Sequence, residues 1–160
     1  MQQKSFGNLP KGDRKQRLEA SANFKGGAFV NRKETPMLSE DASYASMIWK
    51  FMKSDSLRYP QQIVPSVQTN LREIPFEKPT IVWFGHSTYL ITINNKRILV
   101  DPIFSERASP VQYFGSKAFE GTMVYSLDDF PTIDMVIISH DHYDHLDYNT
   151  ILKLKSTVKR

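Results

Sequence analysis

The chain has 160 residues, of which 40% are hydrophobic, and this content is sufficient for one ordinary domain with a buried core. It contains no cysteine, which excludes disulfide bonds and thiolate metal ligands and is compatible with a reducing, cytoplasmic compartment. The net charge of +4 favours anionic partners, but the lysines and arginines are scattered without interleaved aromatic residues, so we expect no nucleic-acid binding.

Residues 1–79 are predicted to form an N-terminal arm, one helix and a proline-rich wrapping segment. The first residues lack the apolar core of a signal peptide, and no stretch reaches the ~18 consecutive apolar residues of a membrane span. Residues 1–40 are polar and are interrupted by two adjacent glycines and a proline, which indicates an extended arm with one short helix. Residues 60–79 contain four prolines, which argue against regular structure there.

Residues 42–52 are predicted to be helical, because they are rich in helix formers and their apolar residues recur at helical spacing. Ser39 or Asp41 is expected to cap the helix at its N-terminus. The apolar residues either pack in the ordinary way or form a stripe that faces lipid or a partner.

A β-pattern begins at residue 80. Strands are predicted over residues 81–84, 89–93 and 97–100, and the second and third of these form a hairpin around Asn94 and Asn95. The apolar run at 135–138 predicts a fourth, short and buried strand. We expect these four strands to form one mixed sheet.

A long loop, residues 103–131, connects the third and fourth predicted strands and is rich in aromatic residues. Such a loop beside a polar site often lines a pocket for an apolar or amphipathic substrate. Packing of the loop on itself is the alternative.

Three of the four histidines follow the fourth predicted strand within six residues, in the order His-x-His-x-Asp-His. Neutral imidazole and carboxylate together suit zinc or another borderline divalent metal. Because alternate residues of an extended segment share a side, His140 and His142 can meet one ion, whereas Asp144 and His145 are better placed to hold a second. The alternatives are solvated histidines in a polar loop, or a helical surface on which His140 and Asp144 form an i, i+4 pair. Asp147 is then expected to cap a helix that begins at Tyr148.

The motif behind an apolar strand is the hallmark of the metallo-β-lactamase fold. Residues 83–88 and 99–105 also resemble the branch of that family that contains N-acylphosphatidylethanolamine phospholipase D and its bacterial homologues, and residues 26–31 are similar too. The resemblance implies an α/β (α+β) fold: residues 80–160 would form the N-terminal half of a four-layered αββα sandwich, as a mixed sheet with flanking helices. It implies further that the domain is incomplete at the C-terminus.

The resemblance also implies a role for each residue of the motif. Two Zn²⁺ ions would be bound, the first by His140 and His142 and the second by Asp144 and His145. Asp144 would also orient the nucleophile, and Tyr143 would contact the substrate phosphate. Two supporting residues lie upstream. The resemblance implies that Asp101 buttresses the metal loop by hydrogen bonds. His86 follows Gly85 at the end of the first predicted strand, where a backbone turn could bring its imidazole towards the site, so we expect it to orient a metal ligand or to contact the substrate and not to bind the metal itself; a histidine hydrogen-bonded within the turn is the alternative.

Three alternative functions are therefore left open. The first is phospholipase D-like hydrolysis of N-acylphosphatidylethanolamine or a related phosphodiester, with peripheral contact at a membrane surface. The second is lactonase or esterase activity on the same fold. The third is a non-enzymatic remnant, or a half that associates with a separate C-terminal half or with a second copy. The family takes a further histidine, a bridging aspartate and a last histidine from later residues, so this fragment is expected to be inactive alone.

Overall fold

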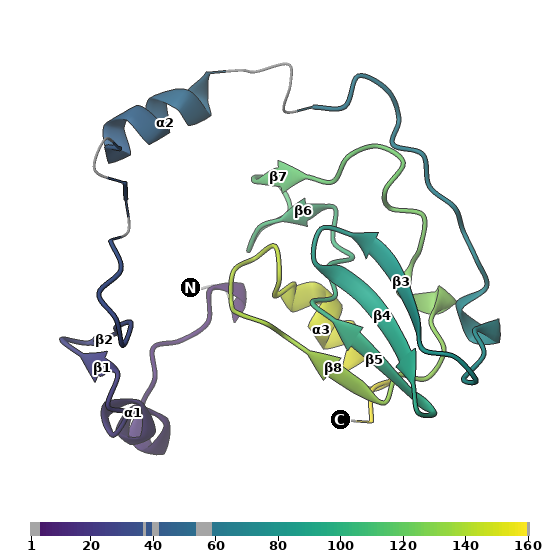
Figure 1. The fold of residues 1–160 in the computed structure, drawn as a ribbon, viewed down its shortest axis with the longest axis horizontal. Helices are drawn as coiled ribbons and strands as arrows, with labels where there is room; N and C mark the ends of the chain where they lie inside the picture. The colour runs from purple at the N-terminus through teal and green to yellow at the C-terminus, as the bar shows by residue number, and fades with distance from the viewer. Residues whose placement is uncertain (1–3, 37, 40–41, 54–58, 160) are drawn as a thin grey trace. The chain divides into compact units, whose positions relative to one another are not determined.

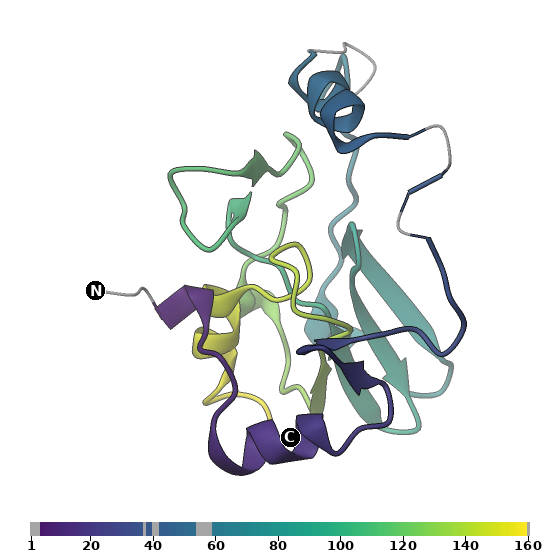
Figure 2. The ribbon, with the colours of Figure 1, turned by 90° about the vertical axis from the view of Figure 1, so that its left-hand side faces the viewer.

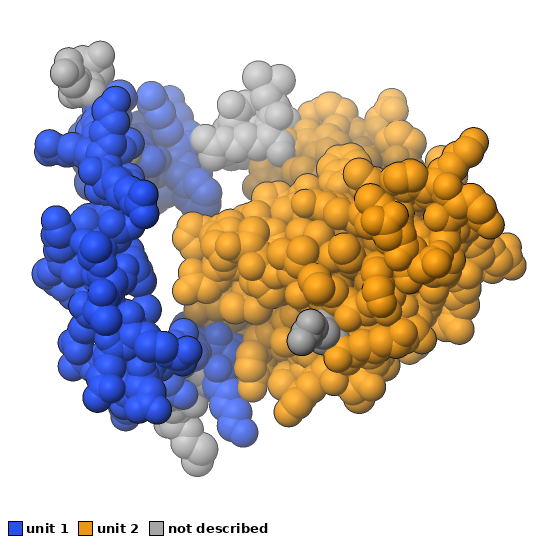
Figure 3. All heavy atoms as spheres, turned by 60° about the horizontal axis from the view of Figure 1, so that its bottom comes forward, with its two compact units in different colours: residues 1–58 blue, residues 59–160 orange. Residues whose placement is uncertain are grey.

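The computed structural model describes residues 4–36, 38–39, 42–53 and 59–159. The chain forms two compact units, residues 1–58 and residues 59–160 (Figures 1 and 3). None of the helices within the described ranges has the length and apolar character needed to cross a membrane.

The first unit consists of short elements: the 3-10 helix η1 (Lys4–Phe6), α1 (Gly12–Glu19), β1 (Phe24–Lys25), β2 (Ala28–Phe29) and α2 (Tyr44–Met52). The helix α1 confirms the predicted short helix of the arm, whereas the β1–β2 hairpin was not predicted. Its turn is formed by Gly26 and Gly27, with φ angles of 61° and 84°. Two successive positive φ angles are what a two-residue hairpin turn demands, and glycine adopts them without steric cost.

The helix α2 confirms the prediction for residues 42–52, but its cap was predicted wrongly. Ser43 occupies the cap position and its side chain accepts a hydrogen bond from the backbone N–H of Ser46, which reciprocates in a capping box. Ser39 lies too far upstream for this role, and Asp41 lies outside the described residues. The apolar side chains of α2 are largely exposed, including Met47, Ile48 and Trp49.

The second unit is built on a four-stranded sheet with the order β3-β4-β5-β8 (Figure 1). The strands are β3 (Thr80–Gly85), β4 (Thr88–Ile93), β5 (Lys96–Val100) and β8 (Met135–Ile137). The first two pairings are antiparallel and the pairing of β5 with β8 is parallel, so the predicted mixed sheet is confirmed. Asn94 and Asn95 make the turn between β4 and β5 with φ angles of 48° and 56°.

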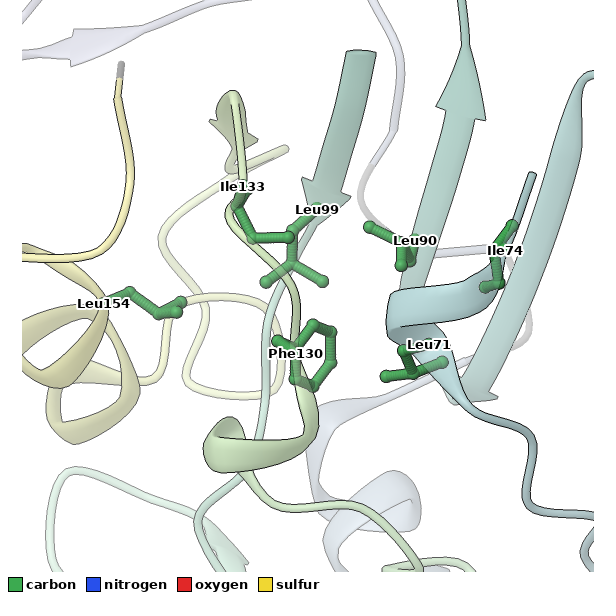
Figure 4. Close-up of a cluster of buried hydrophobic side chains, with 7 residues drawn as sticks. All are labelled: Leu71, Ile74, Leu90, Leu99, Phe130, Ile133 and Leu154. Atoms are coloured by element: carbon green, nitrogen blue, oxygen red, sulfur yellow. The ribbon is translucent and has the colours of Figure 1, made fainter. Parts of the chain in front are cut away.

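One face of this sheet forms the core of the unit (Figure 4). Leu90 and Leu99 point from neighbouring strands into this core and are fully buried. The helix α3 (Tyr148–Leu154) lies on this side of the sheet and contributes Leu154 (Figures 1 and 2). The remaining members of the core come from the connecting segments: Leu71, Ile74, Phe130 and Ile133.

The opposite face of the sheet is apolar but exposed. Because side chains alternate along a strand, the residues between the buried ones project to this face. Ile81 and Trp83 of β3 are 67% and 69% exposed, and Met135 and Ile137 of β8 are also exposed. The sheet therefore has one covered and one uncovered apolar face, as expected for half of a layered sandwich.

Two connecting segments pack against each other beside the sheet. Residues 59–79 contain one short 3-10 helix, η3 (Leu71–Glu73), and otherwise wrap along the end of the aromatic loop. Ser66 Oγ donates to the Gly121 carbonyl at 2.6 Å, and the backbone N–H of Thr69 donates to the Tyr125 hydroxyl at 2.7 Å. The proline-rich segment is thus hydrogen-bonded along the aromatic loop, and the predicted division of the chain after residue 79 stays a prediction.

The aromatic loop itself contains β6 (Arg107–Ala108), β7 (Ser116–Lys117) and the 3-10 helix η4 (Leu127–Asp129). Phe84 of β3 contacts the rings of Phe104, Tyr125 and Phe130 at centroid distances of 5.1–5.8 Å. These aromatics pack on the loop and on the core, which is the alternative that the sequence left open.

Candidate metal centre

The histidine motif occupies the loop between β8 and α3, beside the end of β5. Because β5 and β8 are parallel, their carboxyl ends meet at one edge of the sheet, which is the edge where such sheets bind ligands. The backbone N–H of Asp101, directly after β5, donates to the Ile137 carbonyl at 2.9 Å. The motif begins at His140, three residues after Ile137. Asp147 holds the other end of this loop by capping α3, as predicted.

Asp101 is the buried anchor of the loop. One carboxylate oxygen accepts the Ser139 backbone N–H at 2.7 Å, and the other accepts the Ser139 hydroxyl at 2.7 Å and His145 Nδ1–H at 2.8 Å. Burial alone would raise the pKa of Asp101, but the hydrogen bonds from His145 and Ser139 outweigh it, and the pKa is lowered. The ionised carboxylate fixes the His145 proton on Nδ1 and leaves the lone pair of Nε2 available as a ligand.

His140 and His142 form the first donor pair. Nε2 of His140 lies 3.1 Å from Nδ1 of His142, and the ring centroids are 4.6 Å apart. Two nitrogens bound at ~2.0–2.1 Å to one tetrahedral zinc lie roughly 3.3 Å apart, so this spacing suits a shared ion. The Ser139 hydroxyl lies 3.0 Å from Nδ1 of His140 and positions its ring.

Asp144 and His145 form the second pair, and a third side chain joins them. His145 Nε2 lies 3.9 Å from a carboxylate oxygen of Asp144, and His86 Nε2 lies 3.1 Å from the same oxygen. Among the described residues these three form the group whose donor atoms all lie within 4.8 Å of one another. The sequence indicated that the turn after β3 could bring His86 towards the site, and the structure places it there.

The segment that carries the motif is not helical, which rules out the helical i, i+4 alternative for His140 and Asp144. The side chains of His140 and His142 are exposed, whereas those of Asp144 and His145 are partly buried. Tyr143 lies between the two pairs in the sequence and is 36% exposed. Its contact with a substrate, and the binding of metal by the other four residues, remain predictions.

The part played by Asp147 was only half foreseen. Beyond capping α3, its buried carboxylate accepts the backbone N–H groups of Phe104 and Ser105 at 3.2 and 2.8 Å, and the Ser105 hydroxyl at 2.9 Å. These bonds tie the chain after Asp101 to the end of the metal loop. The local sequence predicts a cap but gives no signal for partners 42 or 43 residues away.

The donor set fits a borderline divalent metal. Imidazole nitrogen and carboxylate oxygen suit zinc and exclude neither manganese nor iron, and hard cations that need only oxygen ligands are a poor match. His140 and His142 would hold one ion, and Asp144 and His145 a second. The hydrogen bond from His145 to Asp101 is the orienting contact that metal-bound histidines nearly always make.

Comparison with known proteins identifies the family and several relatives of this chain. The family model described as "Beta-lactamase superfamily domain" matches residues 80–159. An uncharacterized protein of Mycobacterium tuberculosis is 36% identical over 137 residues, which cover 85% of this chain and 37% of the relative. The N-acyl-phosphatidylethanolamine-hydrolyzing phospholipase D 1 of Caenorhabditis elegans is 35% identical over 72 residues, which cover 45% of this chain and 20% of that enzyme.

A UPF0173 metal-dependent hydrolase of Sulfolobus acidocaldarius is 35% identical over 79 residues, which cover 48% of this chain and 29% of the relative. The chain thus spans between a fifth and two fifths of the length of these relatives. Two of these three relatives are named as hydrolases, and one of those two is described as metal-dependent.

Proposed function

Because this chain belongs to the metallo-β-lactamase superfamily, we propose that it contributes to a zinc-dependent hydrolytic site that cleaves the phosphodiester bond of N-acylphosphatidylethanolamine or a related phospholipid. The observation that carries the proposal is the convergence of two donor pairs at the carboxyl ends of β5 and β8, with His145 held by Asp101 at 2.8 Å. A histidine that is only a solvated loop residue needs no hydrogen bond to a buried carboxylate to orient its ring.

The residues of the loop would divide the chemistry between them. Bound zinc ions would supply Lewis-acid stabilisation of the negative charge that develops on the phosphate oxygens. The Asp144 carboxylate would accept a hydrogen bond from the attacking water and orient it. The Tyr143 hydroxyl would donate a hydrogen bond to a phosphate oxygen, and Asp101 would keep the ligating nitrogen of His145 unprotonated.

The choice of substrate is supported by three observations. The C. elegans relative, which matches this chain over 72 residues, is named as a phospholipase D that hydrolyses N-acyl-phosphatidylethanolamine. The net charge of +4 favours an anionic phospholipid, and the exposed apolar residues of α2 would support peripheral contact with a membrane surface.

A complete two-ion site needs further donors, because catalytic zinc normally has three protein ligands and the motif offers two to each ion. We propose that these donors come from a segment or partner that packs on the uncovered sheet face around Ile81 and Trp83. A second copy of this chain is the other candidate for that position, and the oligomeric state in solution distinguishes the two.

The test is a fusion of this chain to the part of the mycobacterial relative that follows the matched segment, assayed for product release from N-acylphosphatidylethanolamine. We expect chelator-sensitive hydrolysis that His142→Ala abolishes. The matched control is Asp141→Asn, because Asp141 is exposed and lies in the same loop outside both donor pairs. Cleavage of lactones but of no phosphodiester would change the proposed substrate class. Activity that persists both in the presence of chelator and in His142→Ala would reject a metal-dependent reaction.

A further inference from the structure

We infer that His86 is itself a metal ligand, so that this chain alone builds a three-donor cation site from His86, Asp144 and His145. The inference rests on the proposed metal-dependent function and deepens it. It assigns the second ion a protein ligand from the turn between β3 and β4, 58 residues before Asp144, in addition to the two that the motif supplies.

The distances place His86 within ligand range of the other two donors. Its Nε2 lies 3.1 Å from the Asp144 carboxylate oxygen, which is nearer than His145 Nε2 at 3.9 Å. The His86 and His145 rings meet edge to face at a centroid distance of 5.1 Å. Donors bound to one tetrahedral zinc lie roughly 3.3 Å apart, so three donor atoms that already lie within 4.8 Å of one another can share one ion after side-chain movements of up to about 1.5 Å.

The backbone of the turn is held in the conformation that this placement needs. His86 has a φ angle of 46°, in the left-handed region that few residues other than glycine adopt, and Gly85 before it has a φ angle of 109°. The indole Nε1–H of Trp83 donates to the His86 carbonyl at 2.9 Å, and the pairing of β3 with β4 shifts register at this point. Strain of this kind concentrates at functional sites, and here it aims an imidazole at the metal loop.

The turn is also tied to the loop that carries the other two ligands. The Ser87 hydroxyl donates to the Asp144 carbonyl at 3.4 Å, so the positions of His86 and Asp144 are coupled through the backbone as well as through their side chains. His145 is oriented independently by Asp101. Two nitrogens and one oxygen make the three-ligand set that is typical of catalytic zinc, with one position left for substrate or water.

The competing explanation is that His86 only donates a hydrogen bond to Asp144 and orients it. The two explanations differ at Nε2 of His86, which carries a lone pair towards the ion in the first case and a proton in the second. His86→Gln separates them further, because its side-chain amide can still donate to Asp144 but is a poor ligand for zinc.

The experiment is a zinc titration of the full 160-residue chain, followed by long-range ¹⁵N NMR of the imidazole nitrogens and by the visible absorption of the Co²⁺ form. We expect the Nε2 resonances of His86 and His145 to shift together as one site fills. We expect His86→Gln to weaken that site at least tenfold, and His142→Ala to leave it intact. Asn95→Ala is the matched control, because Asn95 is another left-handed residue of the same sheet, with a φ angle of 56°, away from the motif.

Each outcome decides one of the proposals. If His145 responds to zinc while Nε2 of His86 does not shift, and His86→Gln binds as tightly as the wild type, the inference is overturned and the metal site survives without His86. If no histidine responds, the proposed metal-dependent function fails with it. Circular dichroism melts of His86→Gln and Asn95→Ala identify a loss of folding, and His86→Asn, which tolerates a positive φ, repeats the test if His86→Gln does not fold.

Discussion

Replacing Asp101 by asparagine isolates the contact on which the proposed metal centre depends. Asparagine has nearly the same volume and also tolerates the left-handed φ of 41° at this position, so steric strain is not introduced. Its single carbonyl oxygen can still accept the Ser139 backbone N–H, as Oδ1 of Asp101 does. The amide nitrogen then faces the Ser139 hydroxyl and His145 Nδ1, where an anionic acceptor stood before.

Two consequences follow from this exchange. Two hydrogen bonds to a buried carboxylate are lost or inverted, and since each is worth ~1.5–3 kcal/mol, we expect the free energy of unfolding to fall by about 3 kcal/mol. Nδ1 of His145 must also accept a hydrogen bond from the new amide, so the imidazole proton moves to Nε2 and the lone pair that would bind metal is lost. The affinity of the second site should therefore fall by roughly 10- to 100-fold.

Urea denaturation measures the first effect, and ¹⁵N NMR of the His145 ring together with zinc titration measures the second. Asp141→Asn provides the control, because it removes the same charge from an exposed position in the same loop. An Asp101→Asn protein with wild-type stability and an Nδ1-protonated His145 would refute the role assigned to Asp101. A loss of stability without a change of tautomer would confine that role to the fold.

Two further predictions concern the structure that supports the site. Asp134 has a lowered pKa because it accepts the Arg97 backbone N–H at 3.0 Å and pairs with Lys159. A carboxyl group whose pKa is depressed in the folded state stabilises the fold at pH values above its unfolded pKa of ~3.9. This contribution is lost as the pH falls through the folded-state pKa. Asp134→Asn should therefore lower the free energy of unfolding by about 1 kcal/mol at pH 7 and by much less at pH 3, and urea denaturation at both pH values measures the difference. Gly121→Ala should lower the free energy of unfolding by more than about 2 kcal/mol, because the new Cβ would collide with the Val64 carbonyl and the φ angle of Gly121 is 90°. Equal thermal melts of the variant and the wild type would show that the wrapping segment is not held at this point.

The sheet was predictable because its signals are local. Alternating apolar residues, the Asn94–Asn95 turn and the continuous apolar run before the motif each describe a few consecutive residues, and the strands over 80–100 and 135–137 follow them closely. The cap of α2 was missed for a similarly local reason. Ser39, Asp41 and Ser43 are all capping types within five residues, and only the reciprocal bond with Ser46 selects one of them.

The candidate site was predictable in its residue types but not in its construction. The spacing of His140, His142, Asp144 and His145 predicts two donor pairs from neighbouring residues alone. The contribution of His86 depends on the left-handed turn after β3, and that conformation is decided by the pairing of β3 with β4 and not by the histidine itself. A positive φ is uncommon for any residue other than glycine, so the sequence alone carries only a weak signal for this placement of His86.

The order of the sheet explains why one loop can carry both donor pairs. Asp101 and Ser139 are 38 residues apart, and only the parallel pairing of β5 with β8 brings them into contact at one edge. The same pairing brings Asp101 within 2.8 Å of His145 Nδ1, so a contact made by the fold sets the tautomer of a proposed ligand. Asp147 closes the loop from its other end by binding the backbone of Phe104 and Ser105. The metal loop is therefore fixed at both ends by buried carboxylates that are not themselves ligands, which leaves the side chains between them free to be exposed and still correctly placed.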